Sequence, residues 1–434
     1  MKKVFLILFF VCLLSPYLYA DKTKYVFFIV GDGMSVSNEV ALSTFLYGKS
    51  KMLVWDNFSI QTVMTTWSID SYKGNYSENN FDSENGYDTN LAGINPYPYY
   101  SSKKADRYFK DTIATDYAAA STAMATGEKV YNGTICYDKK NNKFIENIVD
   151  KINKRNEYNV ALVTTDNFYN YITAGFVSHN KSKNNYNKIA EEILSKTKPE
   201  IIASQNDIYE MNNVAQSNGY FVLDYSEINK PQVFNLLNKK IFIRLKKYYV
   251  PQPVEYFTSD SFEYKNPDTK FSNIVSDVTN LLLEKKKPFF LLAEITDINK
   301  ANCENDYNKM LGAVYELNET VKKIYDLINS NDTDMSFDNS IIIVVSPYSS
   351  GMLRFKNYLA KGNLPRPNVA YSKTTIVKMD TNIDYKAKDN VNELTGCYCT
   401  GAKSNLFKKY INEKNVVDNT DIYNVLNDIF INND

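Results

Sequence analysis

The chain has 434 residues and carries 50 basic and 50 acidic side chains, so its formal net charge is zero. This balance argues against a nucleic-acid partner, because a phosphate-binding face needs a clustered excess of cations. The length allows one large domain or two, and a single histidine limits the imidazole ligands available to a zinc site.

The first twenty residues have the pattern of a secretory signal. Two lysines precede an apolar stretch from Val4 to Leu14, and a small residue, Ala20, ends the segment. The apolar stretch is too short for a membrane-spanning helix. We therefore expect residues 1–20 to be removed, and residues 21–434 to be lumenal or secreted, without a transmembrane anchor.

Four apolar runs rich in β-branched and aromatic residues predict strands that are buried on both faces. They are Tyr25–Val30, Asn159–Thr165, Phe289–Glu294 and Ile341–Val345. Helical patterns alternate with them, for example at Tyr186–Leu194, Lys309–Leu327 and Thr420–Phe430. This alternation predicts an α/β fold with a largely parallel central sheet and helices on both faces.

Residues 72–108 are rich in Asn, Ser, Tyr and Gly with little periodicity, and they predict a long surface loop. Glycosylation sequons begin at Asn57, Asn75, Asn132, Asn180, Asn318 and Asn331. We expect a glycoprotein, although several sequons in a chain this rich in Asn arise by chance. The bias toward Asn, Lys, Tyr and Ile suggests an AT-rich coding genome, as in many intracellular parasites.

The segment from Thr115 to Gly127 reads TDYAAASTAMATG, and it resembles the nucleophile segment of alkaline phosphatases. On its own it could equally be an Ala-rich buried helix. In the family, a Ser opens this helix beside two zinc ions, and Tyr117 stands at its position. Asp32, in the turn after the first predicted strand, resembles the family's first metal-binding residue. The resemblance spans most of the chain from Asp32 to Gly401, which favours a single domain with a three-layer, alkaline-phosphatase-like sandwich.

Family members use two zinc ions and one magnesium ion, and the resemblance implies that most of their ligands are missing here. The family's zinc Asp and His correspond to Asn299 and Cys303, and its Asp-His pair corresponds to Pro347 and Tyr348. The last zinc His, which precedes Thr-Gly, corresponds to Cys399. None of these positions retains its family ligand.

The magnesium positions correspond to Asn170 and Ile172, and the phosphate-binding Arg corresponds to Lys183. Lys183 keeps a positive charge, but it lacks the planar guanidinium group with which Arg binds two phosphate oxygens at once. Asp32 and Glu294 survive. Because zinc needs about three or four convergent ligands, we expect no bound metal, with Asp32 capping a turn and Glu294 paired with a cation.

Removal of the signal would leave four cysteines: Cys136, Cys303, Cys397 and Cys399. The resemblance places Cys303 and Cys399 at two ligand positions of one zinc, which predicts that they converge to form a disulfide. Cys397 is a close competitor, and Cys136 takes whichever partner is left. A residual zinc site is the other interpretation of these thiols.

Two functional hypotheses remain. The first is a secreted pseudophosphatase without catalytic residues, which binds protein partners in a secretory or vacuolar lumen (a parasitophorous vacuole if the source is an intracellular parasite). The alternative is a phosphoric monoester hydrolase of alkaline phosphatase type with Tyr117 as nucleophile, which would need a base or a metal to activate it. Ser121 is no substitute, since it lies about one turn deeper in the helix. Lys183 could still attract an anion to the helix start.

Overall fold

The computed structural model describes residues 22–72, 107–109, 111–205, 209–230, 233, 235–245, 270–330, 332–357, 359–362, 369–371, 376–378 and 383–432. The predicted signal at residues 1–20 lies outside these ranges, as does nearly all of the predicted loop at 72–108. Among the helices in the described ranges, none combines the length and the hydrophobicity needed to cross a bilayer.

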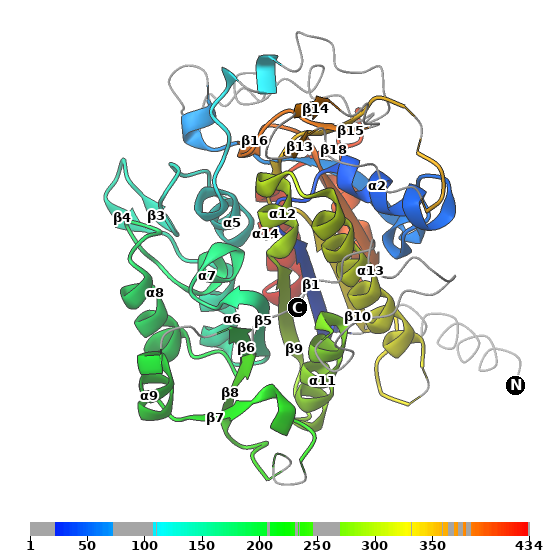
Figure 1. The fold of residues 1–434 in the computed structure, drawn as a ribbon. Helices are drawn as coiled ribbons and strands as arrows, with labels where there is room; N and C mark the ends of the chain where they lie inside the picture. Colours follow the sequence, from blue (N-terminus) through cyan, green and yellow to red (C-terminus); the bar gives the residue numbers. More distant parts are fainter. Residues whose placement is uncertain are drawn as a thin grey trace, which may run out of the picture.

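A ten-stranded sheet forms the centre of the molecule, with the order β18-β2-β17-β10-β1-β9-β5-β6-β8-β7 (Figure 1). Its strands are β1 (Tyr25–Gly31), β2 (Ile60–Thr65), β5 (Asn159–Asn167), β6 (Ile201–Gln205), β7 (Tyr220–Asp224), β8 (Lys240–Leu245), β9 (Phe289–Ile295), β10 (Ser340–Val345), β17 (Thr395–Gly401) and β18 (Val416–Asp418). Strand β17 pairs antiparallel with β10 and β2, and the other neighbours pair in parallel. The four predicted strands are confirmed as β1, β5, β9 and β10.

Helices cover both faces of the sheet. One face is covered by α2 (Val36–Tyr47), α11 (Phe271–Glu284), α12 (Asp297–Glu304) and α13 (Tyr307–Asn329). The other is covered by α5 (Tyr117–Thr126), α6 (Ile148–Arg155), α7 (Tyr171–Val177), α8 (Tyr186–Glu192), α9 (Tyr209–Ser217) and α14 (Asn419–Phe430). The predicted three-layer sandwich is therefore confirmed, and the predicted helices correspond to α8, α13 and α14.

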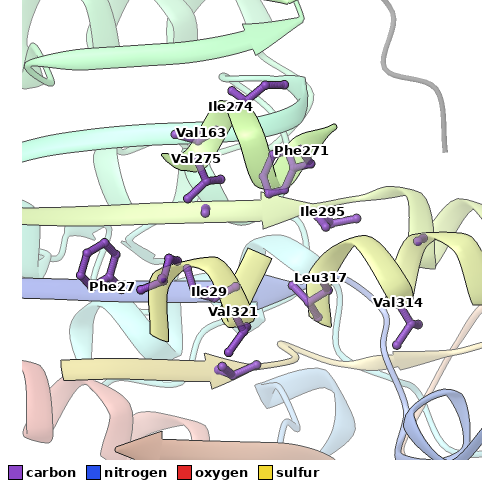
Figure 2. Close-up of a cluster of buried hydrophobic side chains, with 14 of the residues drawn as sticks. Phe27, Ile29, Val163, Phe271, Ile274, Val275, Ile295, Val314, Leu317 and Val321 are labelled. Carbon is purple, nitrogen blue, oxygen red and sulfur yellow. The ribbon is translucent and has the colours of Figure 1, made fainter. Parts of the chain in front are cut away.

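Alternating side chains of the central strand supply both cores, because successive strand residues point to opposite faces. Phe27 and Ile29 belong to the core beneath α11 and α13, whereas Val26 and Phe28 belong to the core beneath α5, α7 and α14. Figure 2 shows the first core, in which Phe27 and Ile29 of β1 belong to one cluster with Leu317 and Val321 of α13. Burial of these apolar side chains on both faces accounts for the continuous hydrophobic pattern of the strand.

Shorter elements surround this framework. The small strands are β3 (Tyr137–Asp138), β4 (Lys143–Phe144), β11 (Ser349–Ser350), β12 (Leu353–Phe355), β13 (Val369–Tyr371), β14 (Ile376–Lys378), β15 (Ile383–Tyr385) and β16 (Asn390–Val391). The short helical turns are η1 (Val54–Asn57), η2 (Ile69–Ser71), η4 (Ile193–Thr197), η5 (Tyr225–Glu227) and η8 (Ser404–Lys409). The π-turn η4 continues α8 directly.

The central strands end level with one another. Val30 of β1 pairs with Val345 of β10 on one side and with Glu294 of β9 on the other, and Glu294 pairs with Thr164 of β5. Parallel strands in this register bring the residues at their carboxyl ends to a single edge of the sheet, where α/β proteins bind ligands.

Candidate functional site

The carboxyl edge of the central strands gathers a set of ionisable side chains. Asp32 follows β1, Asp166 lies near the end of β5, Glu294 lies near the end of β9, and Tyr348 follows β10. Helix α12 begins directly after β9 (Figure 1). From this helix Lys300 reaches the same edge, where it pairs with Asp166. Asp32, Glu294 and Tyr348 were predicted from the sequence for this edge, whereas Asp166 and Lys300 were not.

Asp32 is fully buried, and its Oδ2 accepts a hydrogen bond from the Tyr348 hydroxyl at 2.9 Å. Its Oδ1 is also buried and has no hydrogen-bond partner among the described residues. Burial raises the pKa of Asp32 to about 7; the Tyr348 hydrogen bond and the Lys300 charge act in the opposite direction, and the Asp166 charge adds to the rise. The prediction that Asp32 caps a turn was wrong. Its carboxylate accepts a hydrogen bond from Tyr348, which follows the neighbouring strand β10.

Glu294 is also fully buried, and both of its carboxylate oxygens accept backbone hydrogen bonds. The Ile172 N–H donates to Oε1 at 3.0 Å, and the Thr173 N–H donates to Oε2 at 3.2 Å. These donors belong to the first turn of α7, where free N–H groups and the helix dipole favour an anion. Burial, followed by the Asp32 charge, raises the pKa of Glu294 well above its ordinary value. The predicted cation partner was wrong, since helix N–H groups occupy both oxygens.

Lys300 forms an ion pair with Asp166, with 2.5 Å between Nζ and Oδ2. Asp166 also accepts a hydrogen bond from the Asn170 side chain at 3.3 Å. Burial alone would lower the pKa of Lys300, but the charges of Asp297, Asp166 and Asp32 and the Asp166 hydrogen bond outweigh it and raise that pKa. The ammonium group is therefore held in its charged form among carboxyl groups.

Tyr117 is the first residue of α5, as predicted, and Asp116 is the N-cap. Asp116 Oδ1 accepts from the Ala119 N–H at 2.9 Å, and Oδ2 pairs with Lys183 Nζ at 2.9 Å. The same Nζ lies 4.3 Å from the centre of the Tyr117 ring, within the range of a cation–π contact. Lys183 is thus engaged by Asp116 and by the Tyr117 ring at the start of α5, a kind of position whose free N–H groups favour an anion.

The Tyr117 hydroxyl is held in its protonated form. Burial, then the neighbouring Tyr186, Asp116 and Asp32, raise the pKa of Tyr117 well above its ordinary value. Ser121 lies deeper in α5, where it is fully buried and its Oγ donates to the Ala118 carbonyl at 3.1 Å. Nucleophilic attack by either hydroxyl would require a base, a metal ion or a lowered pKa.

The zinc and magnesium ions implied by the resemblance do not fit the donors present. At the magnesium position Ile172 contributes a buried apolar side chain, and both oxygens of Glu294 already accept hydrogen bonds. At the zinc positions Asn299 and Cys303 contact each other at 3.5 Å, and Tyr348 donates to Asp32. Across the described ranges, no three His, Cys, Asp or Glu side chains form a group that could hold a metal ion.

The predicted Cys303–Cys399 disulfide does not form, and all four cysteines of the described chain are free thiols. Cys399 lies within β17, pairs with Ile343, and faces the core beneath α5 and α14. Cys303 lies on α12, a helix that packs against the opposite face. The sheet therefore separates the two thiols.

The register of β17 also explains the error. Strand β17 contains two Thr-Gly pairs, and the resemblance uses the second, which follows Cys399. The first, Thr395-Gly396, begins β17 at the carboxyl edge, where the Thr395 hydroxyl donates to the Ser346 carbonyl at 2.8 Å. The residue that precedes this pair is Leu394, which cannot bind a metal.

The single histidine has a structural role. His179 Nε2 lies 3.0 Å from Asp150 Oδ2, and Nδ1 lies 3.0 Å from Glu192 Oε1. Burial alone would lower the pKa of His179, but its hydrogen bonds to the two carboxylates raise it to about 9. The side chain links α6 to α8 and contributes nothing to the carboxyl edge of the sheet.

Comparison with known proteins relates this fold to one family. The alkaline phosphatase family model matches residues 75–214. Alkaline phosphatase 4 of Bacillus subtilis is 24% identical over 255 residues, which cover 56% of this chain and 50% of the relative. Alkaline phosphatase 3 of the same bacterium is 24% identical over 247 residues. This chain spans about half the length of the curated relatives it matches.

Solved structures share the fold over nearly the whole chain. The alkaline phosphatase from the Antarctic bacterium TAB5 has a TM-score of 0.63 at 15% identity, covering 94% of this chain and 98% of its own. The cold-active alkaline phosphatase from Shewanella sp. has a TM-score of 0.62 at 16% identity, covering 94% and 99%. At such identities the likeness shows the architecture alone, and it confirms the predicted fold.

Proposed function

We propose that this chain, which resembles alkaline phosphatases in sequence and fold, is a secreted pseudoenzyme of that family. In this proposal it serves as a binding or scaffold component of a protein complex in a secretory or vacuolar lumen. Its partners are proteins, and it uses no zinc or magnesium. The fold is retained, whereas function depends on the site.

The state of Tyr117 is the observation that carries the proposal. A phenol attacks phosphorus only after it has been activated, and activation lowers its pKa or removes its proton. Tyr117 has a raised pKa instead, with burial as the largest cause. Lys183 lies over the ring and pairs with Asp116. The residues at the family's nucleophile position therefore stabilise the inert form of the hydroxyl.

A hydrolysis assay on the purified mature chain tests the loss of activity. We expect p-nitrophenyl phosphate to be cleaved no faster by the natural chain than by a Tyr117→Phe variant, with and without added zinc and magnesium. An active bacterial alkaline phosphatase is the positive control. Hydrolysis that Tyr117→Phe abolishes would instead support the phosphomonoesterase with a tyrosine nucleophile.

A separate experiment tests the scaffold role. The chain, tagged at its carboxyl end, is captured from its native compartment under gentle detergent, and the associated proteins are identified by mass spectrometry. We expect a reproducible set of partners that a tagged, unrelated secreted protein does not capture. A chain recovered alone would contradict the scaffold role without restoring catalysis.

A further inference from the structure

Four carboxyl groups lie near the carboxyl edge of the sheet and act on one another through their charges, although within the described residues they do not converge into a metal-binding group: Asp32, Asp166, Glu294 and Asp297. Asp32 and Glu294 are fully buried, and Asp166 retains little exposure. Buried carboxylates without compensation are costly, since each loses its hydration and repels the others. In a metal-dependent hydrolase, divalent ions supply the compensating charge at such an edge.

Lys300 provides positive charge at this position. Its Nζ pairs with Asp166 at 2.5 Å, and its charge also acts on Asp32 and Asp297. Asp297 precedes Lys300 by three residues on α12, so the two side chains lie on the same side of the helix. One ammonium group is thereby placed among carboxyl groups that come from three different elements.

Hydrogen-bond donors occupy oxygens that a metal would need. The Tyr348 hydroxyl donates to Asp32 Oδ2. The N–H groups of Ile172 and Thr173 donate to the two oxygens of Glu294. A divalent ion that bound Asp32 Oδ2 or Glu294 would have to displace these donors, and an ion at Asp32 would also approach the Lys300 ammonium; both steps are unfavourable.

We propose that Lys300 is a built-in replacement for the divalent cations of this edge, so that the site is charge-compensated without metal and rejects added Mg²⁺ and Zn²⁺. Tyr348 and the first turn of α7 complete the replacement by donating to one oxygen of Asp32 and to both oxygens of Glu294. The inference is independent of the scaffold role. Hydrolysis without metal would contradict the pseudoenzyme proposal and leave this one intact.

Thermal unfolding of three chains tests the proposal: the natural chain, Lys300→Met and Lys309→Met. Methionine keeps much of the lysine stem but removes the charge. Lys309 is a matched control, because it forms exposed ion pairs with Glu304 and Asp306. We expect the natural chain and Lys309→Met to melt at nearly the same temperature, with no response to EDTA, Mg²⁺ or Zn²⁺. Lys300→Met should melt several degrees lower, and Mg²⁺ should recover part of that loss.

Elemental analysis and calorimetry of the natural chain give an independent test, even if Lys300→Met does not fold. Stoichiometric zinc or magnesium in the purified protein, or heat from Mg²⁺ titration that matches a single site, would overturn the proposal. Equal melting of Lys300→Met and Lys309→Met would also overturn it. Lys300→Arg, which restores the charge, should be indifferent to Mg²⁺ like the natural chain, and stabilisation of this variant by Mg²⁺ would count against the proposal.

Discussion

The Tyr348 hydroxyl donates a hydrogen bond to Asp32 at 2.9 Å, between segments that follow the neighbouring strands β10 and β1. Both side chains are buried, and a hydrogen bond in the protein interior is electrostatically stronger than one in water. The contact joins a residue at a family zinc position to a carboxylate that the family uses for metal. A protein hydroxyl thus does part of what a metal ion would do, which is to satisfy the carboxylate.

Tyr348→Phe tests this contact. The variant leaves Asp32 with both oxygens buried and without a hydroxyl donor, and we expect a loss of about 1–3 kcal/mol in the free energy of unfolding. Urea denaturation followed by circular dichroism measures the change. Tyr131→Phe is the control, since the described contact of Tyr131 uses its ring. If both variants unfold at the same urea concentration as the natural chain, the hydrogen bond contributes no stability.

Tyr117→Ser restores the family's nucleophile, and we expect it to restore no activity. Asp116 would still hold Lys183 at the helix start, and the missing zinc ligands would leave the hydroxyl without Lewis-acid activation. Hydrolysis of p-nitrophenyl phosphate with added zinc is the measurement, after circular dichroism has shown that the variant is folded. Zinc-dependent turnover by this variant would show that the site retains more metal affinity than its donors indicate.

The ion pairs of His179 should make the free energy of unfolding depend on pH. Its pKa is raised from 6.5 to about 9 in the folded chain by hydrogen bonds to Asp150 and Glu192, against the opposing effect of burial. A raised pKa means that the folded state holds the proton more tightly than the unfolded state. The resulting stabilisation is complete below pH 6.5 and is lost as the pH rises through about 9.

We therefore expect the natural chain to exceed His179→Gln in unfolding free energy at neutral and mildly acidic pH, by a margin that narrows as the pH approaches 9. Urea titrations across this range measure the margin. A margin that stays constant with pH would indicate that packing, and not the charge on His179, makes the difference.

The sequence was sufficient for the framework and insufficient for the details of the site. The apolar run at Tyr25–Val30 predicts β1 because a strand that is buried on both faces has an apolar side chain at nearly every position. Such a strand can be recognised without an alternating pattern. The Asp166–Lys300 pair joins positions 134 residues apart, and no local pattern reports such a contact. The choice between Thr395-Gly396 and Thr400-Gly401 depends on how β17 pairs with β10, which is a property of the folded sheet.

The structure separates the sequons that can carry a glycan from those that cannot. Asn57 is exposed at the end of η1. Asn318 is almost fully buried, and its Oδ1 accepts from the Val54 N–H at 3.0 Å. Asn132 uses its Nδ2, the atom to which a glycan attaches, to donate to the Ala114 carbonyl at 2.9 Å. Asn180 is also nearly buried.

Expression in a glycosylating secretory host, followed by enzymatic deglycosylation in heavy-oxygen water, should therefore label Asn57 and leave Asn132, Asn180 and Asn318 unlabelled. The sequons at Asn75 and Asn331 lie outside the described residues. Peptide mass spectrometry locates the label without any substitution. A labelled Asn318 in folded protein would be incompatible with the packing of α13.

The thiols give the last prediction, which opposes the disulfide expected from the resemblance. Cys136, Cys397 and Cys399 are buried, and Cys303 is half-buried. Burial, followed by the nearby charges of Asp389, Asp32 and Glu304, raises the pKa of Cys303 to about 11. Since the thiolate is the reactive form, iodoacetamide should label Cys303 slowly in the native chain and the other three only after unfolding.

Denaturation in urea without reductant should then expose four reactive thiols. The control is the same chain reduced before unfolding, which should give an identical count by intact mass. A count lower by two in the unreduced sample, restored by reductant, would reveal a disulfide. Peptide mapping would then show whether it joins Cys397 and Cys399 within β17 or requires the sheet to be rearranged around Cys303.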